Sequence, residues 1–128
     1  MKFTKLFADE EGETHFKDVE IELESVNYAP PAPPLNLSAF NPAIQYAFCV
    51  AHSGWFGDWH PTPLRQILFY LSGEVEVQVS DGEVRRFSAG SIVLVEDTTG
   101  KGHVSRVVGS IDNVMAVVQL PDARARAR

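Results

Sequence analysis

A two-residue alternation of valine with polar side chains in the middle of the sequence most constrains what this chain can fold into. In Glu74–Val79, every second residue is valine and the residues between are Glu or Gln. Successive side chains of a β-strand point to opposite faces of a sheet, so this spacing predicts a strand with one buried face. The following Ser80-Asp81-Gly82-Glu83 predicts a tight hairpin turn, because Asp-Gly supplies the positive backbone angles that such turns require.

Similar short apolar segments recur along the chain and are separated by turns that contain glycine. No window shows apolar residues at helical spacing over three turns, so the sequence predicts no helix. Short strands joined by such turns are typical of an all-β sandwich or barrel. The expected strands are 19–24, 44–52, 66–71, 74–79, 84–87, 92–95, 103–108 and 114–120.

Two changes in composition divide the chain into three regions. Residues 29–34 include four prolines, and proline lacks a backbone donor, so this stretch predicts an extended connector. We therefore expect 1–34 to hold an N-terminal arm or outer strands together with the connector, and 35–120 to form the β-barrel. The alternating arginines near the C-terminus predict a flexible tail at 121–128.

The net charge and the apolar content narrow the classes of partner. The 128 residues carry a formal net charge of −6 at pH 7, whereas a nucleic-acid-binding protein usually presents a basic face, so we expect no nucleic-acid partner. No apolar run approaches the ~20 residues of a membrane-spanning helix, so we expect no membrane partner. The N-terminus lacks the apolar stretch of a signal peptide, which predicts a cytoplasmic protein.

One histidine-containing segment has the spacing of a known motif. Gly54 is followed by five residues and then His60. Gln66 comes six residues after His60 and is itself followed by six residues and Gly73. The first motif of the cupins has this form: a glycine, five residues, His-x-His, a glutamate and a second glycine.

A second segment completes the resemblance. Gly90 opens a stretch that runs through an apolar strand and a polar loop to His103, as the second cupin motif does. Residues 44–120 therefore resemble the small single-domain cupins. The resemblance implies an all-β fold, the cupin double-stranded β-helix or jelly-roll barrel, with an N-terminal arm or extra strands. It also implies a homodimer, which would cover exposed strand edges.

Metal-binding cupins hold their ion with three His and one Glu, and this chain keeps part of that set. The second His position holds Thr62 and the Glu position holds Gln66; both are neutral and poor ligands for a divalent metal. Asp58 precedes His60 by two residues and can complete a two-His, one-carboxylate set with His60 and His103. The sequence leaves open whether the protein has no cofactor or a divalent metal (Fe, Zn, Mn or Ni).

Without a metal, the same residues suit proton transfer. Histidine titrates near neutral pH, so His60 or His103 can act as a general acid or base. Gln66 can hold a carbonyl or enolate oxygen, and Thr62 adds a hydroxyl. These four residues are the candidate catalytic residues.

Five other side chains are candidates for substrate binding. Trp59 can stack on a planar ligand, and Tyr46 and Phe48 share one face of their expected strand. His52 has the same parity as Tyr46 and Phe48, and Lys101 can meet a carboxylate. Each of these residues can also have a purely structural role, in core packing, in covering a barrel end or in a solvated loop. The sequence therefore leaves open whether they bind substrate or have a structural role.

Three functions follow from these residues. The first is a small-molecule enzyme that uses acid/base chemistry in the barrel, of the lyase, isomerase or cyclase type. The second is a metal-dependent cupin dioxygenase or isomerase, and the third is a non-enzymatic cupin that binds a small molecule. The sequence does not decide whether the chain is an enzyme, because one fold can host many activities. The expected ligand is a small molecule with a carbonyl or carboxylate group.

Overall fold

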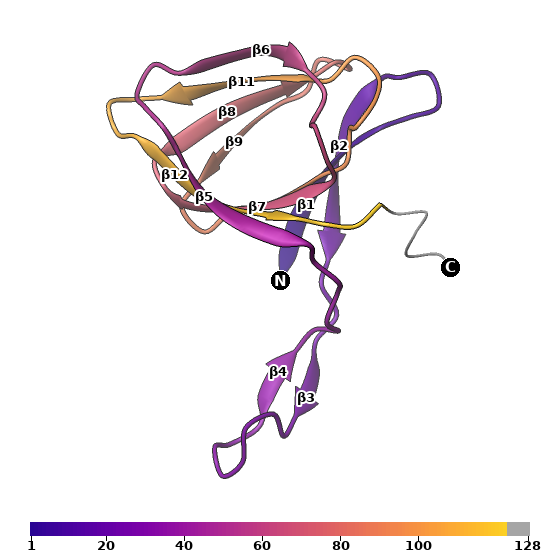
Figure 1. Ribbon diagram of the computed structural model, residues 1–128, viewed down its shortest axis with the longest axis vertical. Helices are drawn as coiled ribbons and strands as arrows, with labels where there is room; N and C mark the ends of the chain where they lie inside the picture. Colours follow the sequence, from indigo (N-terminus) through magenta and orange to yellow (C-terminus); the bar gives the residue numbers. More distant parts are fainter. Residues whose placement is uncertain (123–128) are drawn as a thin grey trace.

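β-Strands form all of the regular secondary structure in the computed structural model, which describes residues 1–122 (Figure 1). The arginines of the expected tail lie in 123–128, outside the described residues. The strands are β1 (Lys2–Ala8), β2 (Thr14–Glu20), β3 (Glu24–Val26), β4 (Leu35–Leu37), β5 (Gln45–Ala51), β6 (Phe56–His60), β7 (Gln66–Ser72), β8 (Glu74–Val79), β9 (Val84–Ser88), β10 (Ile92–Val95), β11 (His103–Val108) and β12 (Asn113–Gln119). The prediction of an all-β chain is confirmed. Within the described part, no helix long and apolar enough to cross a membrane occurs.

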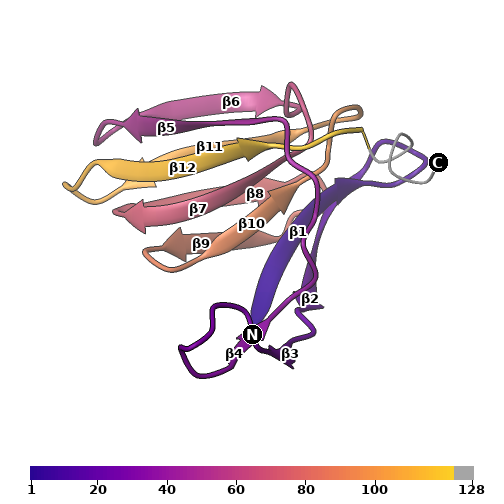
Figure 2. The same ribbon diagram turned by 60° about the horizontal axis from the view of Figure 1, so that its bottom comes forward.

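Two sheets lie face to face and enclose the interior of the molecule (Figures 1 and 2). The six-stranded sheet has the order β2-β1-β10-β7-β12-β5, and the four-stranded sheet has the order β6-β11-β8-β9. β8 and β9 form the antiparallel hairpin that the Asp-Gly turn predicts. β7 and β8 follow each other directly in the sequence but belong to different sheets, so the chain crosses from one sheet to the other between them.

The buried apolar side chains of both sheets form one core. Val75, Val77 and Val79 of β8 are buried and the residues between them are half-buried, as the alternation predicts. Tyr70 of the six-stranded sheet stacks on Phe87 of the four-stranded sheet, with ring centroids 5.7 Å apart. The core therefore holds the two sheets together through contacts between aromatic and branched side chains.

The N-terminal strands are part of the six-stranded sheet. β1 pairs with β10 in parallel, with Leu6 opposite Val95, and β2 pairs with β1. Leu6 is 1% exposed, so this strand contributes to the core. The expected strand at 19–24 is wrong in its second half, because β2 ends at Glu20 and β3 begins at Glu24.

A two-stranded hairpin projects away from the two sheets (Figure 1). It consists of β3 and β4, with Val26 opposite Leu35. The proline-rich stretch forms its turn region, between the two strands. The boundary between 1–34 and 35–120 therefore falls inside this hairpin.

Candidate functional site

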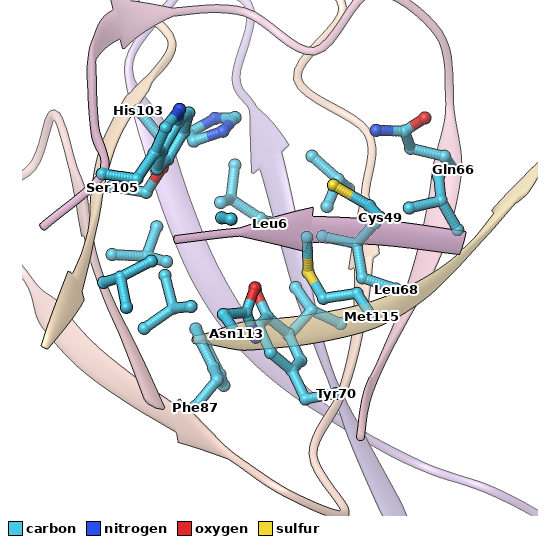
Figure 3. A pocket seen from close by; sticks show the side chains of 18 of the residues that line it. Leu6, Cys49, Gln66, Leu68, Tyr70, Phe87, His103, Ser105, Asn113 and Met115 are labelled. Atoms are coloured by element: carbon cyan, nitrogen blue, oxygen red, sulfur yellow. The ribbon is translucent and has the colours of Figure 1, made fainter. Parts of the chain in front are cut away.

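A cavity of about 300 Å³ lies between the two sheets. Most of its wall is apolar and comes from the core itself. Polar side chains reach it at few points, and Figure 3 shows several of them among the apolar ones. The side chains on the wall that carry a polar atom are Cys49, Trp55, His60, Gln66, Tyr70, His103, Ser105 and Asn113. A mostly apolar cavity with a few placed polar groups is typical of a site for a small molecule.

Strands β6 and β11 place two of the predicted catalytic residues side by side. His103 lies opposite His60 in the antiparallel pairing of these strands. The two ring centroids are 4.8 Å apart and the ring planes are tilted by 54°. Both side chains line the cavity, so the structure brings together the two histidines that the motif spacing singles out.

Gly102 permits this close approach. Its φ of +75° lies in the left-handed region, which favours glycine. A Cβ at this position would lie 2.3 Å from the carbonyl carbon of His60. The hydroxyl of Thr14 donates a hydrogen bond to the Gly102 carbonyl at 2.7 Å. The loop that leads into His103 is therefore fixed directly against the end of β6.

A buried carboxylate orients His103. Nδ1 of His103 lies 2.7 Å from Oδ2 of Asp97, whose side chain has no exposed surface, while the His103 side chain is 12% exposed. The carboxylate oxygen accepts the hydrogen bond of Nδ1–H in this contact, so Nε2 is the nitrogen left for a ligand. Asp97 itself does not line the cavity. It therefore acts on a ligand only through His103.

A backbone carbonyl orients His60, also through a hydrogen bond with Nδ1. Nδ1 of His60 donates to the carbonyl oxygen of Asp58 at 2.5 Å. Each imidazole thus has its Nδ1 held by an acceptor and keeps Nε2 to hold or release a proton.

Gln66 lines the cavity at the end that holds the histidines, whereas Thr62 lies outside the cavity wall. Gln66 lies opposite Val95, two residues before Asp97. Thr62 is 3% exposed, and its hydroxyl donates to the Leu64 carbonyl at 2.8 Å. The Thr62 backbone N–H donates to the Asp97 carbonyl at 3.1 Å. Thr62 therefore stabilises the loop that carries Asp97 and does not reach the cavity wall.

The structure does not bring Asp58 to the histidines. His60 lies opposite His103, but Gly57 lies opposite Ser105, so β6 has one residue more than β11 in this stretch. Such a bulge changes the alternation of side chains along a strand. The Asp58 side chain consequently lies in a surface hollow with the polar side chains of β8, outside the cavity.

The donor atoms at the cavity do not match the metal site that the resemblance implies. With Asp58 and Thr62 elsewhere, His60, His103 and the neutral amide of Gln66 remain. Among residues 1–122, no group of three or more His, Cys, Asp or Glu side chains could hold a metal ion. Two imidazoles and an amide are a poor set for a tightly held divalent ion, so these residues do not fit one.

Tyr46 and Phe48 lie on the outer face of β5 and not on the cavity wall. Their exposed fractions are 73% and 72%. Cys49, Val50 and Ala51, at the other end of the same strand, line the cavity instead. The two aromatic residues share one face, as predicted, but it is the face that points away from the interior.

The other three candidates for substrate binding also lie outside the cavity. Trp59 lines the surface hollow beside β8. His52 is paired with Asp112 at 3.1 Å and its side chain is 83% exposed. Lys101 is paired with Glu13 at 2.8 Å on the surface. None of the three lines the cavity in the described structure.

Asp97, Ser105 and Asn113 were not among the site residues predicted from the sequence. A signal for Asp97 was present, because it continues the alternation of Val93 and Val95, which are both buried. Period two places Asp97 on their face and therefore inside. Ser105 follows His103 by two residues on β11 and could have been found by the same argument.

Comparisons with known proteins support the fold. Neither a protein-family model nor a curated protein matches the sequence. A cupin 2 conserved barrel domain protein from Salinispora arenicola is similar with a TM-score of 0.52 and 20% identity, over 84% of this chain and 81% of its own. The cupin domain of Cnp3 from Schizosaccharomyces pombe is similar with a TM-score of 0.52 and 12% identity, over 99% of this chain and 88% of its own. Together with the all-β architecture, these similarities show that the chain is a small protein with the cupin fold.

Proposed function

We propose that this chain is a small-molecule enzyme that transfers protons in its barrel cavity, as a lyase, isomerase or cyclase does. The observation that carries the proposal is the 2.7 Å contact between Nδ1 of His103 and the buried carboxylate of Asp97. A carboxylate in this position holds one tautomer of the imidazole. It also stabilises the imidazolium that forms when Nε2 takes up a proton.

The proposed step is proton abstraction next to a carbonyl group. Nε2 of His103 takes the proton, the C–H bond breaks, and its electron pair forms an enolate. The Gln66 amide donates a hydrogen bond to the enolate oxygen, where negative charge develops. His60, whose ring centroid is 4.8 Å from that of His103, is the second proton carrier and returns a proton to the product.

The donor set favours this function over a metal-dependent dioxygenase or isomerase. Among the described residues, the cavity wall offers the imidazoles of His60 and His103 and the amides of Gln66 and Asn113, and no carboxylate. Proton transfer needs only the imidazoles and a donor for the oxygen. A non-enzymatic cupin would bind a ligand in the same cavity without exchanging its protons, and the experiment below separates the two.

Proton exchange followed by NMR tests the proposal. The protein is incubated in deuterated water with a panel of small ketones, keto acids and hydroxy acids. We expect at least one compound to lose the proton signal next to its carbonyl faster than in buffer. His103→Gln and Asp97→Asn should each slow this exchange about a hundredfold or more, the range of a general base. His52→Gln is the matched control, because His52 lies on the surface outside the cavity.

Three results would contradict the proposal. Exchange that persists in His103→Gln would assign the proton transfer to another group. Ligand binding with no exchange for any compound would favour the non-enzymatic protein. Near-stoichiometric Fe, Zn, Mn or Ni, lost in both His60→Ala and His103→Ala, would favour the metal-dependent enzyme.

We also propose that the partner of this chain is a second copy of itself, joined through β5. β5 is an edge strand of the six-stranded sheet. Its outer face and the residue before it carry exposed apolar side chains: Ile44, Tyr46, Phe48 and Val50. An edge strand leaves backbone donors and acceptors unpaired, and a two-fold symmetric contact between two copies would pair them and cover the apolar side chains.

A further inference from the structure

Asn113, the first residue of β12, is buried on the cavity wall with one polar atom unpaired. Its side chain has no exposed surface and lines the cavity. Its Nδ2 donates to the Ser72 carbonyl at 3.2 Å. Its Oδ1 has no hydrogen-bond partner in the described structure. Buried polar atoms without a partner are few in native proteins, so this oxygen calls for an explanation.

The partner of Nδ2 fixes which end of the amide is free. The carbonyl oxygen of Ser72 only accepts hydrogen bonds, so the NH₂ group of Asn113 must face it. Turning the amide over would place two acceptors against each other. Oδ1, which only accepts, is therefore the atom left for a ligand.

The backbone around Asn113 is held in place by Gly73. This glycine has a φ of +75°, and a Cβ there would lie 2.6 Å from the Asp112 carbonyl oxygen and 2.9 Å from Cα of Asn113. The contact lies where the chain crosses from the six-stranded sheet to the four-stranded sheet. The unpaired oxygen is thus part of a preformed wall, with little freedom to move toward another partner.

Asn113 and the histidines lie at opposite ends of the cavity. Val79, the last residue of β8, is opposite His103, whereas Gly73, just before β8, contacts Asn113. Figure 3 shows Asn113 beside Tyr70 and away from His103. The wall between the two polar ends is lined by buried valines of β8.

We infer that Oδ1 of Asn113 binds the substrate, and that the cavity takes a small molecule with a hydroxyl or N–H donor at one end and a carboxylate or carbonyl at the other. This inference rests on the proposed function, because it assigns the carboxylate or carbonyl end to the histidines. The cavity volume of about 300 Å³ equals roughly ten water molecules of the liquid, which suits one ring with a short side chain. A molecule of the same shape without the donor leaves Oδ1 unpaired, so Asn113 selects for the donor.

Three matched compounds test this inference by isothermal titration calorimetry. para-Hydroxyphenylpropanoate has the carboxylate, the apolar ring and the donor. Phenylpropanoate lacks the hydroxyl, and para-fluorophenylpropanoate fills similar space without a hydrogen to donate. We expect the wild-type protein to bind the hydroxyl compound about tenfold more tightly than either of the others, since the donor pairs an otherwise unpaired buried oxygen.

The variant Asn113→Leu assigns the preference to Asn113. It should bind all three compounds within about twofold of one another and keep the affinity of the wild type for phenylpropanoate. Asn36→Leu, at an exposed position of β4, is the matched control and should keep the full preference. The wild-type comparison of the hydroxyl and fluoro compounds needs no variant, so it decides the question even when Asn113→Leu does not fold.

Equal binding of the three compounds by the wild-type protein would overturn the inference, as would a preference that persists in Asn113→Leu. Binding of none of them would overturn the assigned class of substrate. A different result would contradict the proposed function. If the protein prefers the hydroxyl compound but catalyses no proton exchange, Asn113 is still a binding residue and the proposed enzymatic activity is wrong. If the protein catalyses proton exchange but shows no preference for the hydroxyl compound, the proposed activity stands and the role of Asn113 is wrong.

Discussion

The carboxylate of Asp97 holds His103 by its Nδ1 edge at 2.7 Å, from outside the cavity that His103 lines. The group that orients the imidazole is therefore separate from the groups that a ligand contacts. A ligand can enter without displacing Asp97, because the carboxylate has no exposed surface. A ligand in the cavity therefore need not break the hydrogen bond that orients the His103 ring.

Replacing this carboxylate should change the tautomer of His103. In Asp97→Asn the new amide can turn its NH₂ group toward Nδ1, which would place the proton of a neutral ring on Nε2. The base at the cavity is then lost although the shape of the side chain is kept. The nitrogen NMR chemical shifts of the His103 ring report the tautomer. An unchanged Nδ1–H tautomer in the variant would show that Asp97 does not set it.

An added methyl group should destabilise the protein more at Gly102 than at another glycine that also has a positive φ. Gly102→Ala brings a Cβ to 2.3 Å from the His60 backbone at a φ of +75°. Gly82→Ala has a similar strain at a φ of +99° but meets no atom within 4 Å, and should cost about 1–2 kcal/mol of unfolding free energy. The clash at Gly102 should add a further 1–3 kcal/mol, roughly the cost of overpacking. Equal losses in urea unfolding would show that the loop moves aside freely.

His15 joins two turns by hydrogen bonds to two carboxylates. Its Nε2 is 2.7 Å from Asp9 and its Nδ1 is 2.8 Å from Asp81. These hydrogen bonds, the one with Asp9 most of all, raise the pKa of His15 above its ordinary value of 6.5. The hydrogen bond with His15 lowers the pKa of Asp9 below its ordinary value of 3.8. The pKa of Asp81 is also lowered from 3.8, mainly by the hydrogen bond from the backbone N–H of Glu83 and, to a smaller extent, by the hydrogen bond with His15.

The hydrogen bonds of His15 with Asp9 and Asp81 should stabilise the folded protein only over a limited pH range. The folded state holds the His15 proton more tightly than the unfolded state, so its contribution is full below pH 6.5 and is lost as the pH rises through the raised pKa. The aspartate contributions are present above pH 3.8 and are lost as the pH falls through the lowered pKa values.

The variant His15→Gln measures this contribution. The gap in urea midpoint between wild type and variant should be widest between pH 3.8 and 6.5 and should narrow as the pH rises above that range. About 1 M salt should also narrow it, because the pairs are partly exposed. A gap that does not vary with pH would mean that the ion pairs contribute nothing.

The face of β5 should control the oligomeric state. Wild-type protein is expected at twice the 14.1 kDa mass of one chain in light scattering coupled to size exclusion. Tyr46→Glu places a charge on the exposed apolar face and should give the mass of one chain. Val84→Glu changes an exposed valine on β9, an edge strand of the other sheet, and should leave the dimer intact. A wild-type monomer at micromolar concentration would contradict the proposed partner.

Much of the fold could be predicted from the sequence because alternation is a local property. The valines of β8 and the Asp-Gly turn after it specify a half-buried strand and a hairpin, and both occur. The region 1–34 was expected to hold an arm or outer strands, but the position of β1 was not predicted. Phe3, Leu6 and Phe7 do not alternate, and what defines the strand is its pairing with β10. That pairing joins residues far apart in the sequence and leaves no local signal.

The site was only partly predictable, for a related reason. The motif spacing identified His60 and His103, which do meet in the cavity. Alternation tells which residues share a face but not which face is inside, so Tyr46 and Phe48 were grouped correctly and placed on the wrong side of β5. Asp58 was misplaced because the bulge depends on the pairing of β6 with β11, which the sequence of β6 alone does not contain.

The side chains that form the core are largely those that line the cavity. Those that do both are Leu6, Tyr70, Val75, Val77, Phe87, Val93, Val95 and Val107. An occupant would therefore complete the packing of the folded chain, and occupancy and folding become one coupled equilibrium. At a hundred times its Kd, a bound molecule should raise the unfolding free energy by about 2.7 kcal/mol. The melting temperature of the protein is consequently a detector for its natural ligand, which needs no knowledge of the reaction.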